Sequence, residues 1–277
     1  MAEALTGQGM RQVAGQGALP AWDPGQYLKF ADHRLRPAID LMSRVDLAAP
    51  GHVYDLGCGA GNVTRLLAKR WPGAAITGVD GSDEMLARAR AGGTGDRIAW
   101  RRADLTSWHA DRPADLIYSN AALHWLDGHA ELFPRLLGAL APADVLAVQM
   151  PRNHGAPSHT CITEAAAAGP WHQRLRPHLR PSPVAEPAFY YDVLSARAAK
   201  LDIWEMEYLQ VLEGDNPVVE FTKGSALKPL LDALPGEERQ GFLDAYSMRI
   251  GQAYPKRADG RTLFPFRRLF IVATART

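Results

Sequence analysis

Acidic residues at the ends of short apolar segments are the candidates for chemistry in this chain. Asp55 lies within residues 53–62, which read as a buried strand that runs into a turn with alternating glycines, after which a helix begins. Glycines let a backbone approach a ligand closely, and a helix N-terminus offers free N–H groups. This unit predicts a cradle for a cofactor; a tight turn without a ligand is the alternative.

The glycine spacing and the position of Asp55 indicate which cofactor fits. A dinucleotide site needs Gly-x-Gly-x-x-Gly with a pyrophosphate on the helix N-terminus, whereas the glycines here alternate at 57, 59 and 61. A carboxylate just ahead of them would repel a pyrophosphate. It suits the ammonium group of a methionine-type ligand, because it accepts a charge-assisted hydrogen bond.

Two further acids follow apolar segments in the same way. Asp80 ends residues 75–80, and at the carboxyl end of the next parallel strand it can accept hydrogen bonds from both ribose hydroxyls. Its alternative role is to cap the following helix, although Ser82 suits that position better. Asp104 follows a third strand and brings an acid to the same edge, where a solvated loop acid is the alternative.

The string from Asp55 to Asn62 closely resembles the nucleotide loop of class I S-adenosylmethionine-dependent methyltransferases. The resemblance implies S-adenosyl-L-methionine as cofactor and S-adenosyl-L-homocysteine as product. It also implies that Asp104, with Leu105 behind it, lies against the adenine and its exocyclic amine. The residues expected to bind the cofactor are Asp55, Gly57, Gly59, Asn62, Asp80, Gly81, Met85, Asp104, Leu105 and Asn120.

These residues need a sheet that brings several strand ends together. Segments that read as strands predict the α/β class, with a doubly wound, Rossmann-like, seven-stranded and mostly parallel sheet. The expected strands are 53–56, 75–80, 98–105, 113–120, 145–150, 201–210 and 267–274, and 201–210 reads as a sheet edge. Other helices are expected at 34–45, 129–140, 160–168 and 187–200.

Composition changes after residue 154, where prolines punctuate segments that contain histidine and arginine. We interpret 154–187 and 213–265 as helical cap insertions in a single methyltransferase domain over 21–277, preceded by a flexible leader at 1–20. In the second insertion, a stripe at four-residue spacing is expected to pack as core, namely Phe242, Tyr246, Ile250 and Tyr254.

The fourth expected strand runs into His124 and Trp125, beside the point of a doubly wound sheet where ligands collect. His124 is the candidate catalytic residue, mainly for positioning. A lone histidine is more often held by a backbone partner in a loop or core, and that alternative stays open. Trp125 is expected to form a wall of the pocket.

Several segments together resemble the trans-aconitate 2-methyltransferase family, and the resemblance runs from about residue 21 to the C-terminus. The segments are 22–24 with Tyr27 and Phe30, then 34–37, 120–126, 149–151, 190–192, 202–204 and 266–273. The family implies a cytoplasmic enzyme that methyl-esterifies a carboxylate of trans-aconitate. Such a nucleophile is already ionised at neutral pH, so the reaction needs positioning and desolvation more than a general base.

A small polycarboxylate needs cationic and hydrogen-bonding hosts. The residues expected to bind it are Tyr27, Trp125, Arg152, Tyr190, Tyr191, Lys228 and Arg267, with Lys223 and Arg268 as further candidates. Ser225 and Lys228 depart from the threonine and arginine that the family more often shows. Lysine presents a point charge where arginine presents a fork, which bears on how a planar carboxylate is recognised.

Composition limits the remaining function classes. The 277 residues carry a formal charge of +1, which gives no support to a nucleic-acid partner. The two cysteines fit neither a metal site nor a disulfide framework, and the leader lacks a secretory core or a membrane span. We expect no metal, no membrane association, a small-molecule partner and a cytoplasmic monomer.

Three alternatives keep part of this interpretation. A methyltransferase acting on another small acid or on a natural-product hydroxyl would keep every cofactor motif, with His124 as base in the hydroxyl case. A nicotinamide oxidoreductase shares the fold class, but the glycine spacing and Asp55 argue against it. A binding module that holds the cofactor without turnover has no sequence feature against it.

Overall fold

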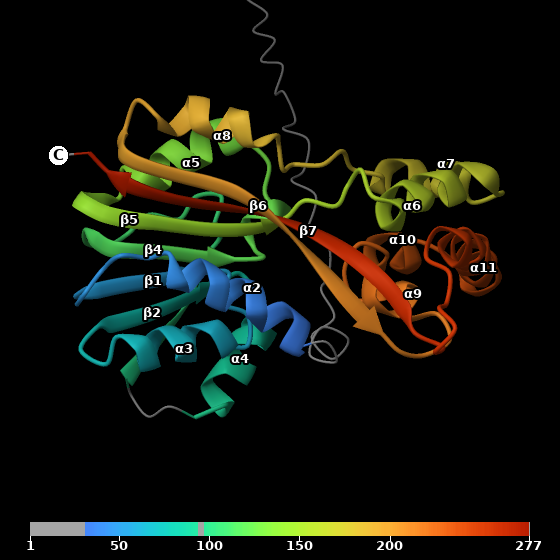
Figure 1. Ribbon diagram of the computed structural model, residues 1–277, viewed down its shortest axis with the longest axis horizontal. Coiled ribbons are helices and arrows are strands. Elements are labelled where there is room, and N and C mark those ends of the chain that lie inside the picture. The colour runs from blue at the N-terminus through green and yellow to red at the C-terminus, as the bar shows by residue number, and fades with distance from the viewer. Residues whose placement is uncertain (1–30, 94–96, 277) are drawn as a thin grey trace, which may run out of the picture.

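The computed structural model describes residues 31–93 and 97–276. The expected leader and Tyr27, a candidate for binding the substrate, lie outside these ranges. The described chain forms an α/β sheet with flanking helices and, at one end, a lobe of helices carried on two long strands (Figure 1).

The sheet has seven strands in the order β3-β2-β1-β4-β5-β7-β6. The strands are β1 (His52–Leu56), β2 (Ala75–Asp80), β3 (Ile98–Arg102), β4 (Ala114–Asn120), β5 (Leu140–Pro151), β6 (Ala198–Leu212) and β7 (Thr262–Ala275). The first five are parallel, and β7 runs antiparallel to both β5 and β6. This confirms the predicted seven-stranded, mostly parallel sheet, with β6 at its edge.

Helices cover both faces of the sheet, which is why the central strands are nearly continuous apolar runs. One face contacts α2 (Ala31–Ser43) and α3 (Asn62–Arg70), beside α4 (Asp83–Ala91); the other contacts α5 (His129–Leu137) and α8 (Pro187–Leu194). In β4, Leu116 and Tyr118 pack toward α2, and Ile117 packs toward α5. The strand ends are thereby held in one rigid edge.

The lobe is built on the far halves of β6 and β7, which extend beyond the parallel strands (Figure 1). Its helices are α6 (Pro157–Ala168), α7 (His172–Leu175), the 3₁₀ turn η3 (Arg176–His178), α9 (Pro217–Lys223), α10 (Lys228–Asp232) and α11 (Gly236–Ala253). They fall within the two segments expected to form a cap. The predicted stripe Phe242, Tyr246 and Ile250 packs with Phe264 and Phe266 of β7 as the core of this lobe.

Some predicted boundaries are wrong. The helix expected over 187–200 ends at Leu194, because the chain turns and enters β6 at Ala198. The helix expected over 34–45 is α2, which ends at Ser43. The final strand was expected from residue 267, yet β7 begins at Thr262, so the second insertion is not helical throughout. Alternate residues of this first half of β7 face the core, since Thr262, Phe264, Phe266 and Arg268 are all buried.

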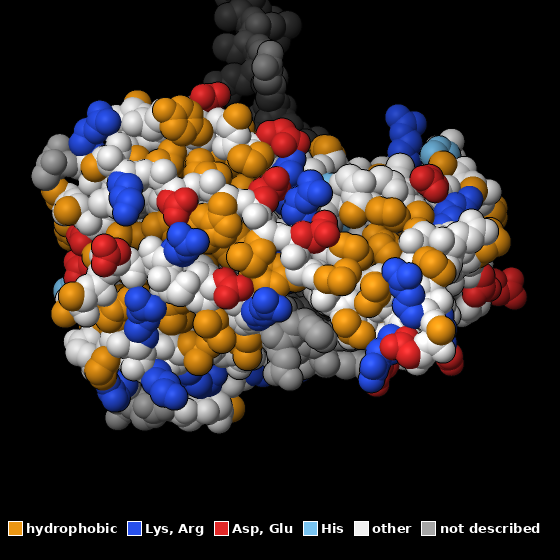
Figure 2. Space-filling model, in the orientation of Figure 1, with side chains coloured by type: hydrophobic (Ala, Val, Ile, Leu, Met, Phe, Trp, Pro, Cys, Tyr) orange, Lys and Arg blue, Asp and Glu red, His pale blue; other side chains and the backbone are white. Residues whose placement is uncertain are grey.

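The surface has no dominant sign of charge on the face that Figure 2 draws. Basic and acidic side chains are scattered over both the sheet and the lobe, with hydrophobic side chains between them (Figure 2). No helix in the described part of the chain is long and apolar enough to cross a bilayer.

Candidate active site

The glycine turn after β1 adopts a conformation that few other residues tolerate. Gly57, Gly59 and Gly61 have φ angles of 75°, 54° and 78°, in the left-handed region. The N–H groups of Gly57 and Cys58 donate to the Val79 carbonyl oxygen, at 2.8 and 3.0 Å. A Cβ on Gly57 would lie 2.1 Å from the Ala122 Cβ. The turn is therefore clamped between the ends of β2 and β4.

Asp55 is a buried carboxyl beneath this turn, with 2% of its surface exposed. The Thr64 hydroxyl, in the first turn of α3, donates to Asp55 Oδ2 at 2.6 Å. Burial raises the pKa of Asp55 to about 7; the Thr64 hydrogen bond opposes the shift and the charge of Asp80 adds to it. A cation nearby would favour the ionised form.

Asp80 lies at the end of β2 with both carboxylate oxygens oriented by the backbone. Oδ2 accepts the Gly59 N–H and Oδ1 accepts the Ser82 N–H, each at 2.8 Å. Burial raises the pKa of Asp80, and these backbone hydrogen bonds oppose the rise. Ser82 is the N-cap of α4, as predicted, since its hydroxyl accepts the Met85 N–H. Each Asp80 oxygen keeps a second lone pair for a ligand hydroxyl.

Asp104 and Leu105 follow β3 near the glycine turn. Asp104 is exposed, and its Oδ1 accepts both the backbone N–H and the hydroxyl of Thr106, at 2.9 and 2.7 Å. Those two hydrogen bonds lower the pKa of Asp104. Leu105 is half-buried, and its Cδ1 lies 3.7 Å from where a Gly57 Cβ would be. Leu105 therefore lies against the glycine turn.

The other expected cofactor residues occupy the same edge. Asn62 begins α3, Gly81 links β2 to the α4 cap, and Met85 is buried in the first turn of α4. Asn120 ends β4 opposite Gln149 of β5. The Asn120 Oδ1 is buried and has no hydrogen-bond partner in the part of the chain that the structure describes.

His124 lies in the 3₁₀ turn η2 (Leu123–Trp125) that follows β4, with its ring 4.7 Å from that of Trp125, which is half-buried. Burial lowers the pKa of His124 to about 3, and positive charge on His154, Arg268, His159 and His129 adds to the shift. A histidine with such a pKa is neutral near pH 7 and is a weak base.

The residues expected to bind the acceptor are not brought together. Arg152 makes ion pairs with Glu205, at 2.6 Å, and with Glu186. Lys228 pairs with Asp232 of its own helix at 2.9 Å, and the half-exposed Arg267 lies 3.9 Å from Glu207. In each case a carboxylate of the protein already lies within ion-pair distance of the cation.

The two tyrosines of α8 also point in different directions. Tyr190 is fully buried in the core, and its hydroxyl lies 2.7 Å from His129 Nδ1. Tyr191 is 58% exposed. The structure therefore does not bring the two expected hydrogen-bond donors together, because neighbouring residues on a helix point to different sides.

Sequence reasoning missed a second group of polar side chains near His124. It comprises Gln149, Asn153, His154 and His159, together with Arg268, which the sequence offers as a further candidate beside Arg267. Arg268 is 2% exposed, and its Nη1 donates to Gln149 Oε1 at 3.3 Å. The phase of Phe264 and Phe266 along β7 places Arg268 inward and Arg267 outward, and was a signal in the sequence.

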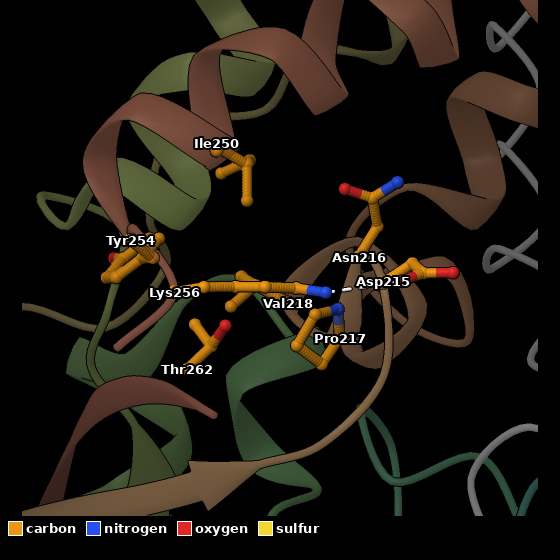
Figure 3. A pocket seen from close by; sticks show the side chains of 9 residues that line it. Asp215, Asn216, Pro217, Val218, Ile250, Tyr254, Lys256 and Thr262 are labelled. Atoms are coloured by element: carbon orange, nitrogen blue, oxygen red, sulfur yellow. Dashed lines mark hydrogen bonds and ion pairs between the residues drawn. The ribbon is translucent and has the colours of Figure 1, made fainter. Parts of the chain in front are cut away.

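A separate pocket of about 200 Å³ lies in the helical lobe. Figure 3 shows its lining, with Lys256 reaching Asp215 across it at 3.2 Å. The lining residues are Asp215, Asn216, Pro217, Val218, Ile250, Gly251, Tyr254, Lys256 and Thr262. Thr262 is six residues before Arg268 on β7, about 20 Å along the strand, so this pocket is distinct from the sheet edge.

Comparisons with known proteins agree with this arrangement. A family model described as "Methyltransferase domain" matches residues 53–143. Solved structures with similar folds include YcgJ from Bacillus subtilis (TM-score 0.57, 15% identity, 87% of this chain and 99% of that one). Another is phosphoethanolamine N-methyltransferase 2 from Haemonchus contortus with S-adenosylhomocysteine (TM-score 0.54, 16% identity, 87% and 53%). At these identities the likeness concerns the fold.

Curated relatives are far more similar in sequence. Trans-aconitate 2-methyltransferase from Azoarcus sp. strain BH72 is 48% identical over 92% of this chain and 99% of the relative. The Streptomyces coelicolor enzyme of the same name is 48% identical over 92% of this chain and 86% of its own length. With that identity over nearly the whole of both chains, this protein belongs to the trans-aconitate 2-methyltransferase family.

Proposed function

We propose that the protein transfers the methyl group of S-adenosyl-L-methionine to a carboxylate of trans-aconitate, giving a methyl ester and S-adenosyl-L-homocysteine. The observation that carries this proposal is 48% identity, over nearly the full length, to a relative whose name states that substrate. The clamped glycine turn, with Asp55 beneath it and Asp80 beside it, supports the proposal that S-adenosyl-L-methionine is the cofactor.

The residues at the sheet edge fit the parts of this cofactor. Asp55 would accept a hydrogen bond from the ammonium, and the second lone pairs of Asp80 would accept the ribose hydroxyls. Asp104 and Leu105 would lie against the adenine. The buried, partnerless Oδ1 of Asn120 and the left-handed Gly57 fit a ligand that approaches the backbone closely. Asn62, Gly59, Gly81 and Met85 complete the proposed lining.

The chemistry needs alignment from this chain more than proton transfer. When bound, the cofactor supplies an electrophilic methyl group on a sulfonium. A carboxylate acceptor arrives ionised, so the protein has only to hold it in line with that methyl group and exclude water. Alignment of this kind contributes roughly 7–11 kcal/mol. Burial is the main cause of the low pKa of His124. A base with such a low pKa argues against the alternative in which His124 deprotonates a hydroxyl.

The proposed activity predicts a specific product. With labelled S-adenosylmethionine and a panel of trans-aconitate, cis-aconitate, citrate, isocitrate and hydroxylated small molecules, trans-aconitate is expected to be methylated with the highest kcat/KM. The label should be released by mild base, because the product is an ester. Methyl transfer only to a hydroxylated compound, as a base-stable ether, would replace this function with the alternative.

Cofactor affinity should depend on pH through Asp55. Burial is the main reason why the pKa of Asp55 is raised to about 7. A ligand ammonium favours the charged carboxylate and lowers this pKa, so ligand binding below pH 7 releases a proton from Asp55. The affinity for S-adenosylhomocysteine should therefore increase with increasing pH, by up to about tenfold per pH unit below pH 7, and should level off above pH 7. Calorimetry from pH 5.5 to 8 measures this. Asp55→Asn is the control, expected to bind weakly with a flat profile; a flat wild-type profile would contradict the role.

We also infer a cytoplasmic monomer that acts on a small-molecule carboxylate. Both cysteines, Cys58 and Cys161, are free and buried, and burial raises the pKa of each thiol, as suits a protein that makes no disulfides. Light scattering with size-exclusion chromatography tests the oligomeric state.

A further inference from the structure

A cluster of polar side chains lies beyond the proposed cofactor residues, where β5 and β7 leave the parallel sheet and α6 begins. We call it the inner polar cluster; it consists of His124, Gln149, Asn153, His154, His159 and Arg268. Gln149, Asn153 and Arg268 are respectively 0%, 3% and 2% exposed. Polar side chains buried to this extent normally have their hydrogen bonds satisfied.

The two amides leave their donor ends unused in the same way. Gln149 Oε1 accepts from Arg268 Nη1 at 3.3 Å, which makes Nε2 the remaining group. Asn153 Oδ1 accepts the Arg267 backbone N–H at 2.9 Å, which leaves Nδ2. Neither Nε2 nor Nδ2 has a hydrogen-bond partner within residues 31–93 and 97–276. Leaving such groups unsatisfied is costly, so a ligand that supplies acceptors explains both.

Three histidines adjoin these amides. The rings of His154 and His159 lie 4.9 Å apart. His159 Nδ1 lies 3.1 Å from the Ser158 hydroxyl, while the buried Nδ1 atoms of His124 and His154 have no partner among the described residues. Among the groups that act on His124, Arg268 carries a full positive charge near pH 7, whereas burial lowers the pKa values of His154, His159 and His129. An anion would be the favourable occupant of such surroundings.

A metal ion is a poorer match than an anion. Amide N–H groups and a guanidinium repel a cation, and the described residues contain no group of three His, Cys, Asp or Glu side chains arranged to hold one.

The cationic residues Arg152, Lys228 and Arg267 are poorer hosts for an anion than the inner polar cluster. Each of them already pairs with a carboxylate of the protein.

We propose that the inner polar cluster is the acceptor pocket, in which Gln149 Nε2, Asn153 Nδ2 and the histidines bind the carboxylates of the substrate that are not methylated, beside the charge of Arg268. This inference rests on the proposed function for the identity of the acceptor. Arg268 also orients Gln149, so it acts both as a charge and as a positioning residue. The third carboxylate is left to face the methyl group, at the end of β4 where Asn120 pairs with Gln149.

Two isosteric substitutions test the pocket. Gln149→Glu keeps the oxygen that accepts from Arg268, and Asn153→Asp keeps the one that accepts from Arg267, while each replaces an N–H donor by an anionic oxygen. Each is expected to raise KM for trans-aconitate by about 30-fold or more, because a carboxylate in the pocket repels the acceptor. The affinity for S-adenosylhomocysteine should stay within about threefold of wild type. Arg267→Gln and Lys228→Gln are controls expected to leave KM unchanged.

The outcomes separate the two proposals. If wild-type protein does not methylate trans-aconitate, the proposed function fails. The pocket is then tested separately, by comparing how tightly the wild-type protein and the same variants bind citrate and trans-aconitate in calorimetry with S-adenosylhomocysteine present. Unchanged KM, or unchanged polycarboxylate binding, in both variants would overturn the pocket, as would a larger effect from Arg267→Gln or Lys228→Gln. Should a variant lose its thermal transition, His154→Gln and His159→Gln replace it, with the same expected direction in KM.

Discussion

Replacing Asp80 with alanine is expected to weaken S-adenosylhomocysteine binding by at least about 100-fold. In the proposed complex the Asp80 carboxylate accepts hydrogen bonds from both ribose hydroxyls. A hydrogen bond to a charged group contributes about 1.5–3 kcal/mol, so losing two removes at least about 3 kcal/mol, which is more than a factor of 100 in affinity. Asp80 also accepts the N–H groups of Gly59 and Ser82, so alanine loosens the glycine turn as well.

Two controls separate ribose binding from this support of the turn. Asp83→Ala removes a nearby acid whose exposed side chain pairs with Arg102, and it should bind the ligand like wild type. Asp80→Asn keeps the size and one acceptor oxygen, and it should bind with intermediate affinity. Calorimetry gives the dissociation constants, and thermal unfolding without ligand reports on the fold. Affinity within about fivefold of wild type in Asp80→Ala would remove Asp80 from the cofactor site.

The cofactor side of the site could be predicted because its signals are local. A strand that ends in an acid, a turn of alternating glycines and the Ser82 cap each lie within a few residues, and parallel strands bring their carboxyl ends to one edge. The position of Asp80 relative to Gly59 follows from that register. What the sequence did not contain was the conformation of the Asp104 loop, where Thr106 occupies one carboxylate oxygen.

The acceptor side could not be predicted in the same way, because it is assembled from distant segments. His124 follows β4, Gln149 lies near the end of β5, His159 belongs to α6 and Arg268 lies in β7. Only the tertiary fold shows which cations already have partners. The choice between Arg267 and Arg268 depends on strand phase, where a shift of one residue moves a side chain to the opposite face.

The position of Tyr190 illustrates the same limit on a helix. Its neighbours in sequence gave no reason to prefer core over pocket, and the deciding contacts are with His129 and Phe133 of α5. The stripe of α11 was easier to interpret, because Phe242, Tyr246 and Ile250 share one face of the helix whatever the partner, and Tyr254, just past its end, packs partly buried against the same core.

Gly57→Ala is expected to have the largest effect on stability, lowering the free energy of unfolding by about 2–5 kcal/mol. The φ angle of 75° costs an L-residue about 1–2 kcal/mol. The added Cβ would also lie 2.1 Å from the Ala122 Cβ, and overpacking of this kind costs about 1–3 kcal/mol. Because the turn must shift to relieve that contact, cofactor affinity should fall together with stability.

Gly73→Ala is the matched control, since a Cβ at Gly73 would meet no atom within 4 Å. Its expected effect is small and is stabilising where the backbone conformation suits alanine, by about 0.4–1 kcal/mol. Urea unfolding of both variants, without and with S-adenosylhomocysteine, measures the two effects together. Equal stability of the two variants would mean that the turn relaxes without cost. If saturating ligand raises the stability of both variants by the same amount, so that the loss in Gly57→Ala persists, the clamp on β4 matters for folding and the cofactor site is unchanged.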